Sequence, residues 1–435
     1  NLTGYGSSAH MKALQRNLAY LGALLARPAL FALYFLSGFV PRRPDLWVFG
    51  SWGGRRFADN AAAFFVYCQD EIASSVRLVW ISREKDIVRR LRSDGYEAYH
   101  TWSARGLASC LRAGVYLFDN FCKDVNFWTS RSARKVNLWS GVPLKTVERD
   151  IDNPRSRYYR LFHGTLPERA ALSIMMPWHV ERPDLIIATS SETARVTQRA
   201  FALEAEAVAI TGYPRNDVLS RRSSIEPDVR RNWPDSFRKA VEAGRFVFFY
   251  LPTYRDSGKS FLDVDWQEVD RLMRRRNGSF FLKLHPDDRS ALQASGEHVA
   301  ELPQGIDIYS LLPATDVLIS DYSSIIFDYM LQEKPIIHYL PDLDEFRTSS
   351  RSLTFDPTEI AVGPVCETGP ELIQALADLL EGVETDAGAR ARWAATRRRM
   401  NLHRDGASSL RVLAAIRDRF PDLWPGQTME SEPAR

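Results

Sequence analysis

A serine and a glycine stand where a chain can bind an anion. The segment Lys135–Asp150, KVNLWSGVPLKTVERD, reads as a short strand, a Ser-Gly-Val-Pro turn and a helix. At the start of a helix, the first backbone N–H groups have no partner within the helix. We therefore predict that Ser140 and Gly141 lie at the tip of this turn, where those N–H groups meet a negatively charged group.

A second segment carries the strongest pattern for binding a diphosphate. In DVLISDYSSIIFDYMLQEKPIIHY, an apolar strand that ends at Ser320 leads into Asp-Tyr-Ser-Ser and then a helix. The first helical turn would offer free N–H groups, and Ser323 and Ser324 would add two hydroxyls. Asp321 and Asp328 are seven residues apart, so we expect both on one face of the helix. The alternative is that the two serines only cap the helix.

Two further segments supply cationic side chains. In FLKLHP, Lys283 and His285 share one side of a predicted strand, because alternate residues of a strand point to one face. In PTYRDSG, Thr253 and Arg255 end another strand, and an arginine can contact a phosphate with two N–H groups at once. We predict that these residues bind phosphate. The alternatives are a structural histidine before a proline and a loop ion pair between Arg255 and Asp256.

Other motifs do not favour a metal or cofactor site. Asp342 and Asp344 have the DxD spacing of a metal-dependent glycosyltransferase, but they stand in a polar loop, so we expect no metal. The arginine runs at 274–276 and 397–399 fit solvated helix faces. The chain contains no P-loop, nucleophile-elbow or zincin sequence. The chemistry predicted here requires no cofactor.

The elements that position these residues follow from the apolar periodicity. After Pro44, short apolar runs alternate with amphipathic stretches, which is typical of a doubly wound parallel sheet. The candidate residues stand at the carboxyl ends of these strands, where open α/β sheets bind ligands. We predict an α/β fold of two Rossmann-type domains that face each other across a cleft. Strands are expected at 45–52, 76–82, 115–120, 135–140, 185–190, 207–212, 246–254, 280–286, 316–324 and 334–340.

The N-terminal part of the chain is expected to lie outside both sheets. Residues 1–10 are interpreted as a cloning remnant. The segment Leu18–Val40 is almost wholly apolar, but Arg27 and Pro28 interrupt it. Since a span takes about 20 apolar residues, we favour a helical segment over 11–44 that is peripheral or monotopic at the cytoplasmic face of the cell membrane. A buried core helix and a true span are the alternatives.

The composition of the 435 residues excludes some classes of protein. Hydrophobic residues make up 45% and charged residues 26%, which is typical of a globular chain. A net charge of only +3 argues against a dedicated nucleic-acid binder. The four cysteines stand far apart without CxxC spacing, so neither a zinc site nor a disulfide scaffold is indicated, and a reducing cytoplasm fits best.

Seven motifs together give a more specific indication. VNLWSGVPLK, GYPRNDVL, PTYRD, KLHP, SDYSSIIFDY with KPIIHY, GPVCET and RDGASS follow one another in this order. The set resembles the CDP-glycerol glycerophosphotransferase family, the polymerases and primases of teichoic acids and related capsule polymers. The similarity runs from about Trp47 to about Ser409. Each motif alone is weak, but seven in the order of the family are specific.

The resemblance implies a GT-B fold and a division of labour within it. Residues 45–215 would form the acceptor side, 216–245 a linker and helix, and 246–390 the domain that binds the CDP-linked donor. Residues 391–435 would form C-terminal helices that cross back, and a tail.

The resemblance also implies the reaction. A polyol phosphate, most simply glycerol phosphate, passes from a CDP-polyol to a hydroxyl of a lipid-linked or glycan acceptor, and CMP leaves. Catalysis would fall to position 140 and His285. Substrate binding would fall to Gly141, Asp150, Thr253, Arg255, Lys283, Asp321, Ser323, Ser324 and Asp328.

Position 140 departs from the pattern of the family. The resemblance implies a histidine there as general base, in a Trp-His-Gly motif, whereas this chain has Ser140. A serine hydroxyl has no useful basicity near neutral pH, whereas an imidazole titrates there. Three explanations stay open: an engineered His-to-Ser substitution, a natural member with another base such as Asp150 or His163, and a natural member that binds without catalysis.

Two other classes of function stay open. A GT-B glycosyltransferase that uses a nucleotide sugar would share the fold and the diphosphate-binding helix. A catalytically inactive, membrane-bound scaffold would keep the binding residues alone. The motifs do not identify the polyol, the acceptor, the number of units added or the oligomeric state.

Overall fold

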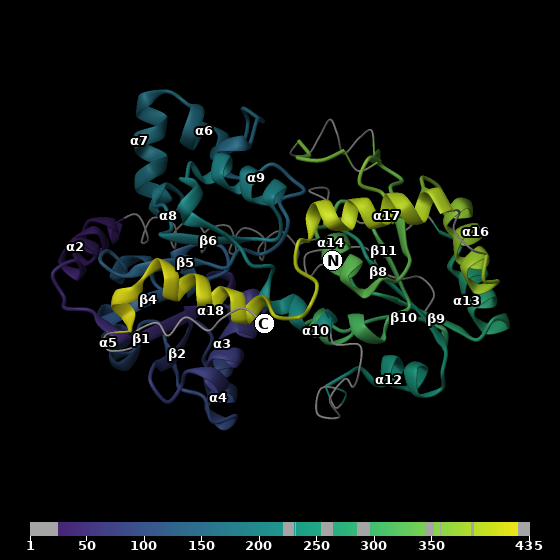
Figure 1. Cartoon of the computed structure of the whole chain (residues 1–435), viewed down its shortest axis with the longest axis horizontal. Helices are drawn as coiled ribbons and strands as arrows, with labels where there is room; N and C mark the ends of the chain where they lie inside the picture. Colours follow the sequence, from purple (N-terminus) through teal and green to yellow (C-terminus); the bar gives the residue numbers. More distant parts are fainter. Residues whose placement is uncertain are drawn as a thin grey trace, which may run out of the picture. The chain divides into compact units, whose positions relative to one another are not determined.

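A computed structural model describes residues 25–220, 230, 232–253, 264–284, 296–343, 352–356, 358–383 and 387–424 of the chain (Figure 1). Two parallel β-sheets with helices packed around them make up the fold. The predicted α/β class with two parallel sheets is thereby confirmed. His285 and Arg255 fall outside the described residues, as do Asp344 and the cloning remnant expected at 1–10.

The first sheet has seven strands in the order β3-β2-β1-β4-β5-β6-β7. The order of the strands reverses between β1 and β4, as in other doubly wound sheets. The central strands are mostly apolar because helices cover both faces of the sheet, and Trp47, Val48 and Phe49 of β1 are fully buried. The strands are β1 (Arg43–Gly50), β2 (Arg77–Ser82), β3 (Ala98–His100), β4 (Ala113–Phe118), β5 (Arg134–Asn137), β6 (Leu185–Ala188) and β7 (Val208–Ile210).

The second sheet has six strands in the order β10-β9-β8-β11-β12-β13, all paired in parallel. Its order reverses between β8 and β11, so the carboxyl ends of these two strands mark its expected ligand edge. The strands are β8 (Phe246–Leu251), β9 (Gly278–Leu282), β10 (Val299–Glu301), β11 (Val317–Ser320), β12 (Ile336–Tyr339) and β13 (Val365–Cys366).

Helices follow most of the strands. They are α2 (Arg27–Ser37), α3 (Asp59–Glu71), α4 (Lys85–Ser93), α5 (Ala104–Arg112), α6 (Arg157–His163), α7 (Leu166–Met175), α8 (Pro177–Val180), α9 (Ser191–Phe201), α10 (Asp217–Ser220), α12 (Asp235–Glu242), α13 (Trp266–Arg275), α14 (Ile325–Tyr329), α16 (Gly369–Leu380), α17 (Ala387–Met400) and α18 (Ser408–Arg419). Several begin at a capping residue. The Thr368 hydroxyl, for example, accepts the N–H of Glu371 at the start of α16.

The chain forms two compact units, and each draws on separate stretches of sequence. The first unit contains the described residues up to Leu138, Thr165–Leu185 and the chain from Arg417 onward. The second unit contains Trp139–Gly164 and Ile186–Ile416. Ser140 and the candidate residues of the second sheet therefore belong to the same unit.

The C-terminal stretch completes the packing of the first unit. The ring of Trp424 lies edge-on to that of Trp47, with the ring centroids 5.5 Å apart. Arg134 pairs with Asp422 at 3.5 Å and lies over the ring of Phe420 at 5.4 Å. Residues from the two ends of the described chain thus share one cluster.

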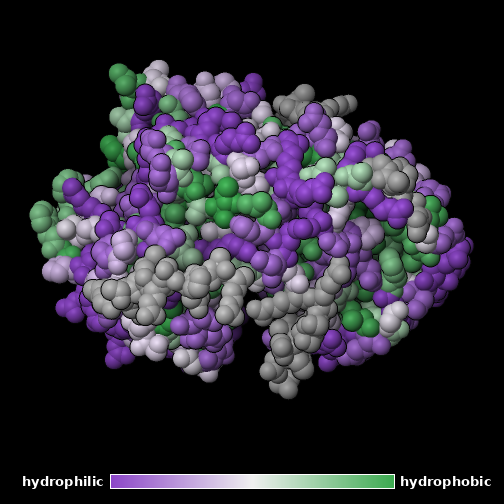
Figure 2. All heavy atoms as spheres, viewed as in Figure 1, coloured by the Kyte–Doolittle hydropathy of each residue, from purple (hydrophilic) through white to green (hydrophobic). Residues whose placement is uncertain are grey.

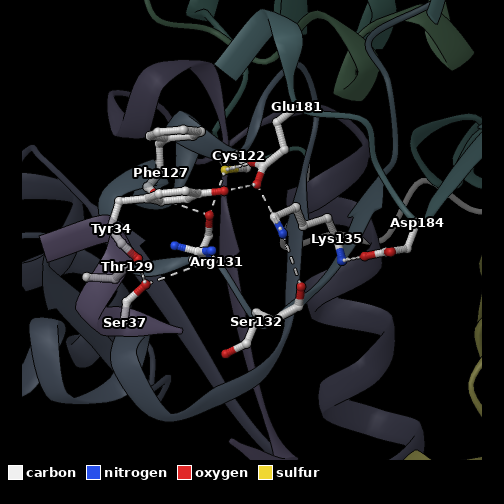
Figure 3. A network of polar contacts seen from close by, with 12 residues as sticks. Tyr34, Ser37, Cys122, Phe127, Thr129, Arg131, Ser132, Lys135, Glu181 and Asp184 are labelled. Atoms are coloured by element: carbon white, nitrogen blue, oxygen red, sulfur yellow. Dashed lines mark hydrogen bonds and ion pairs between the residues drawn. The ribbon is translucent and has the colours of Figure 1, made fainter. Parts of the chain in front are cut away.

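A buried polar network joins α2 to the first unit (Figure 3). Glu181 accepts a hydrogen bond from the Tyr34 hydroxyl at 2.9 Å and from the Cys122 thiol at 3.2 Å, and it pairs with the Lys135 ammonium at 3.1 Å. Burial, together with the nearby Glu181 charge, raises the pKa of the Tyr34 hydroxyl. One face of α2 is therefore held by specific contacts.

The segment expected at the membrane contains no spanning helix in its described part. Arg27 and Pro28 are the first two residues of α2, where proline is tolerated because the first helical turn does not need its N–H. The Arg27 guanidinium donates to the carbonyl of Met175 at 2.9 Å. Among all the helices of the described ranges, none is long and apolar enough to cross a bilayer.

The helix predicted after Ser140 is wrong. The segment Leu144–Thr146 runs extended and pairs with Ser352–Thr354, through N–H···O contacts of 2.9 and 2.8 Å. Only a 3₁₀ turn at Glu148–Asp150 follows. Hydrogen bonds to a distant part of the chain therefore replace the helical ones. All four cysteines are free and buried.

Candidate active site

The Ser140–Gly141 turn has an unusual backbone. After β5 ends, Trp139 adopts a φ of +48°, a region that residues other than glycine rarely occupy. The buried indole of Trp139 packs edge-on against Phe201, with the ring centroids 4.9 Å apart. Such conformations persist where the surroundings hold them, and they cluster at functional sites. The turn is therefore built into the second unit and is not a loose loop.

Arg215 fixes this turn from the other side. Its Nη1 donates to the backbone carbonyl of Ser140 at 2.7 Å, and its Nη2 pairs with Asp328 Oδ2 at 2.7 Å. The guanidinium also lies over the rings of Tyr309 and Tyr213, at 4.9 and 5.4 Å. A planar group held on two edges and by aromatic rings has little freedom to move. Arg215 thus sets the position of residue 140.

Asp328 lies inside this arrangement and is fully buried. Its carboxylate accepts hydrogen bonds from Arg215, from Asn216 Nδ2 and from the Tyr309 hydroxyl, each at 2.7 Å. The sequence led us to expect that Asp328 binds a ligand. Because protein donors occupy both of its oxygens, it is better suited to hold Arg215. Asp321 precedes α14, so the expectation that both carboxylates share one helical face is wrong.

The structure brings Gly141 against Ser324. A Cβ atom at Gly141 would lie 2.5 Å from Ser324 Oγ and 3.2 Å from Arg215 Nη2, and φ at Gly141 is +148°. Only glycine therefore allows the turn to approach α14 so closely. The Ser324 side chain does not cap α14, whereas the Ser323 hydroxyl accepts the N–H of Ile325 at 3.4 Å. With five residues, α14 is too short for a strong helix dipole.

Two predicted residues meet where the second sheet reverses its order. Thr253 follows β8, Asp321 follows β11, and the N–H of Thr253 donates to both oxygens of Asp321 at 3.0 Å. Lys283 follows β9, is half-buried, and donates its N–H to the carbonyl of Tyr250 at 3.1 Å. The carboxyl ends of β8, β9 and β11 thus carry three of the predicted substrate-binding residues, at the edge where such sheets bind ligands.

The alternative bases already have partners. Asp150 forms a two-point ion pair with Arg199, at 3.0 Å from Nε to Oδ1 and 2.7 Å from Nη2 to Oδ2, and this pair raises the pKa of Arg199. His163 Nε2 lies 2.7 Å from the carbonyl of Arg149. Asp342, of the DxD motif, is buried and accepts the Tyr322 hydroxyl at 3.3 Å. Over the described residues, no cluster of metal-ligating side chains occurs.

Comparison with known proteins identifies the family. The family described as CDP-Glycerol:Poly(glycerophosphate) glycerophosphotransferase matches residues 32–418. The chain belongs to this family. These glycerophosphotransferases include the teichoic acid poly(glycerol phosphate) polymerase of Bacillus spizizenii, to which the chain is 24% identical over 369 residues, 81% of this chain and 88% of that protein.

A second relative of this chain has a different polyol, ribitol, in its name. The teichoic acid ribitol-phosphate primase of B. spizizenii is also 24% identical, over 394 residues that make up 88% of this chain and 93% of that one. The solved wall teichoic acid polymerase TagF has the same fold, with a TM-score of 0.72 and 21% identity over 95% of this chain and 99% of that chain. Equal identity to the two relatives leaves the polyol open.

We did not identify from the sequence the residues that hold the Ser140–Gly141 turn in place. Arg215, Asn216 and Tyr309 were not among the predicted site residues, although Arg215 and Asn216 stand in the GYPRNDVL motif. The signal available for Arg215 and Asn216 was their position in the short turn that follows β7, at the carboxyl edge of a sheet. Asp217 of the same motif accepts the N–H groups of Ser408 and Ser409, at 2.8 and 2.9 Å, at the start of α18.

Proposed function

We propose that this chain transfers a polyol phosphate, most simply glycerol phosphate, from a CDP-polyol to a hydroxyl of a lipid-linked or glycan acceptor in the synthesis of a cell-envelope polymer. One observation carries this proposal. Within the matched family region, Arg215 holds the Ser140–Gly141 turn close to Ser324, three residues after Asp321, which accepts the N–H of Thr253. A preorganised turn beside donor groups suits phosphoryl transfer.

The proposed step is an in-line displacement at phosphorus. The acceptor oxygen forms a bond to the polyol-bearing phosphorus, the bond from that phosphorus to the CMP oxygen breaks, and the acceptor hydroxyl loses its proton. Lys283, Arg255, His285 and the donors around Ser323 are proposed to offset the charge on the diphosphate. Positioning and charge stabilisation account for most phosphoryl-transfer catalysis, so the proposal includes no metal or cofactor.

The proton needs an acceptor, and Ser140 does not supply one. Its hydroxyl is not basic near neutral pH, and Asp150 and His163 are engaged elsewhere in the second unit. We therefore propose that the chain as it stands binds its substrates but turns over slowly. Whether serine at 140 is natural or introduced is a separate question, which the codon in the gene answers.

The function is tested by the product. Purified chain is incubated with CDP-glycerol and a synthetic lipid-linked acceptor, CMP is quantified, and the product is analysed by phosphorus NMR. A new phosphodiester signal with one CMP per added unit is expected. A glycosidic product without a phosphodiester would instead favour the nucleotide-sugar glycosyltransferase. Repeating the assay with CDP-ribitol identifies the polyol.

We also propose that the protein acts at the cytoplasmic face of the membrane as a peripheral or monotopic protein. Leu25, Phe35, Leu36 and Phe39 in and around α2 are 58–81% exposed. In Figure 2 hydrophobic residues gather at the left edge of the view, where Figure 1 places α2. Exposed apolar side chains on a firmly anchored helix suit insertion into a bilayer interface.

A further inference from the structure

The turn after β1 in the first unit occupies a ligand-binding position that the proposed reaction does not yet use. β1 lies between β2 and β4, at the point where the first sheet reverses its order. Ligands of open α/β sheets bind beyond the carboxyl ends of the strands at such a point. The segment Ser51–Arg56 follows β1 directly and so lies at this edge.

Two buried carboxylates fix the backbone of this turn. Asp124 accepts the N–H of Gly53 at 2.7 Å and that of Asn120 at 2.9 Å. Asp119 accepts the Ser51 hydroxyl, and it accepts the N–H of Ala61 at 2.7 Å. Both carboxylates are almost wholly buried. The turn is therefore preorganised, which lowers the entropy that a ligand must remove on binding.

The backbone of the turn is left-handed over three residues in a row. φ is +49° at Trp52, +66° at Gly53 and +79° at Gly54. A Cβ atom at Gly54 would lie 3.1 Å from Arg83 Cγ, so the Arg83 side chain runs directly across this glycine. The N–H of Arg83 also donates to the Gly54 carbonyl at 2.7 Å. The conformation thus brings Arg83, which follows β2, beside Arg55.

The two guanidinium groups lack carboxylate partners. Across the described part of the chain, neither Arg55 nor Arg83 makes an ion pair or a side-chain hydrogen bond. Arg55 is exposed, and Arg83 reaches solvent although the surrounding atoms partly desolvate its guanidinium. Asp124 lies near Arg83, but backbone N–H groups occupy its oxygens. Desolvation and then the charge of Arg55 lower the pKa of Arg83. Two like charges that repel each other are stabilised when an anion binds to both.

We propose that Arg55 and Arg83 form a phosphate-binding subsite of the first unit, with the exposed ring of Trp52 beside it. The inference rests on the proposed function, whose two substrates both carry phosphate: the diphosphate of the CDP-polyol and the phosphodiester of the acceptor. Guanidinium groups bind such oxygens with paired N–H groups. Trp52 is 44% exposed, and its ring is held in place because the Arg56 guanidinium lies over it at 5.0 Å and its Nε1 donates to Asp59 at 3.2 Å. The exposed part of the ring is proposed to contact the adjoining polyol carbons.

A matched pair of double variants tests the subsite. R55Q/R83Q removes the two proposed phosphate ligands, and R89Q/R105Q removes two exposed arginine charges from α4 and α5 of the same unit. Binding of inorganic pyrophosphate, a glycerol phosphate tetramer and CDP-glycerol to the full-length chain is measured by calorimetry. For at least one probe, R55Q/R83Q is expected to weaken binding about ten- to a hundredfold, and R89Q/R105Q by less than about twofold.

The probes distinguish the two sources of phosphate. Loss of tetramer binding with unchanged CDP-glycerol binding assigns the subsite to the acceptor, and the reverse pattern assigns it to the donor. Unchanged binding of all three probes in R55Q/R83Q, equal losses in both double variants, or no binding to the parent chain would overturn the proposal.

The subsite and the proposed function fail in different ways. If binding depends on Arg55 and Arg83 but the product contains no phosphodiester, the subsite is supported and the proposed reaction is refuted. If R55Q/R83Q forms the phosphodiester with unchanged KM for both substrates, the proposed reaction is supported and the subsite is refuted. Circular dichroism verifies that both double variants are folded, which their exposed positions favour.

Discussion

Position 140 lies in a turn that the protein holds firmly, while its side chain lacks the basicity that the proposed step needs. Arg215 and the close approach of Gly141 to Ser324 fix the backbone there, whichever side chain is present. A base placed on this backbone would start from a preorganised position. The geometry around residue 140 thus matters as much as its chemical identity.

Ser140→His is expected to raise CMP release from CDP-glycerol by about 10² to 10⁴, the usual contribution of a general base. Initial rates with a lipid-linked acceptor measure this gain. Ser140→Asn, which adds a polar group without basicity, is the control and should give no increase. Equal rates for the serine and histidine forms would place the base elsewhere.

Asp328→Asn is expected to destabilise the second unit by about 3–5 kcal/mol, since it leaves the buried Arg215 without its counter-ion. The urea midpoint at unchanged slope measures the loss. Asp86→Asn, which breaks an exposed pair with Arg89, is the control and should change the free energy of unfolding by less than about 0.5–1 kcal/mol. Similar losses in both variants would refute a special role of Asp328.

At the scale of elements, α2 combines one anchored face with one exposed apolar face. Tyr34 and Arg27 hold the helix to the first unit. Phe35 and Phe39 are 58% and 81% exposed, although the Arg131 guanidinium lies 3.9 Å from the Phe35 ring centroid. An isolated amphipathic helix would order only on a membrane, whereas α2 is ordered by protein contacts. Its apolar residues are therefore already exposed on a folded helix before the protein meets a membrane.

Phe35→Ser/Phe39→Ser is expected to lower partitioning of the full-length chain into vesicles of phosphatidylglycerol and phosphatidylethanolamine by at least about tenfold, since each buried aromatic ring contributes about 1.5–3 kcal/mol. Co-sedimentation measures the bound fraction. Leu402→Ser/Leu410→Ser removes two side chains of similar exposure from the second unit and should bind like the parent. If Phe35→Ser/Phe39→Ser binds vesicles as well as the parent, α2 does not contribute to membrane binding.

The sequence predicted central strands well and edges poorly. All ten predicted strands occur, and most of them are runs of buried apolar residues such as Val48 or Phe249, although β5 has a single apolar residue and β7 is only half-buried. The unpredicted β3, β10 and β13 are edge strands of two or three residues, too short to show a period. The helix expected after Ser140 failed for another reason. Its backbone pairs with Ser352–Thr354, and no local pattern reveals a partner two hundred residues away.

The site was predictable where residues follow strands directly, as Thr253 and Asp321 do. It was not predictable where one side chain positions another. Asp328 was expected to bind a ligand, but Asn216 and Tyr309 converge on it only in the folded chain. Spacing along one helix carries no information about such partners.

At the scale of the whole molecule, a buried histidine makes stability depend on pH. His338 in β12 is fully buried, its Nε2 accepts the N–H of Val362 at 3.2 Å, and burial lowers its pKa to about 4. In the unfolded chain its pKa is about 6.5. The neutral ring thus stabilises the fold fully above pH 6.5, and this contribution is lost as the pH falls toward 4.

Between pH 7 and pH 5 the chain is expected to lose about 2 kcal/mol from this residue, and His338→Gln should not show that part of the loss. Glutamine can still accept the N–H of Val362. Urea unfolding at both pH values measures the difference, with the exposed His163→Gln as control. An identical pH dependence in parent and His338→Gln would show that the ring has the same pKa in the folded and unfolded states, and would refute the proposed contribution.

The cluster of Trp47 and Trp424 has a consequence for how the protein is made. Trp47 belongs to the first strand, but the residues that cover it, from Arg417 onward, leave the ribosome about 280 residues after Leu138. At roughly 5–20 residues per second, the interval is about 14–56 s. During that time the nascent first unit exposes an apolar face, because the residues that cover it have not yet been synthesised. Synthesis of this protein should therefore depend on chaperones, and a stop codon before Arg417 should yield aggregated chain.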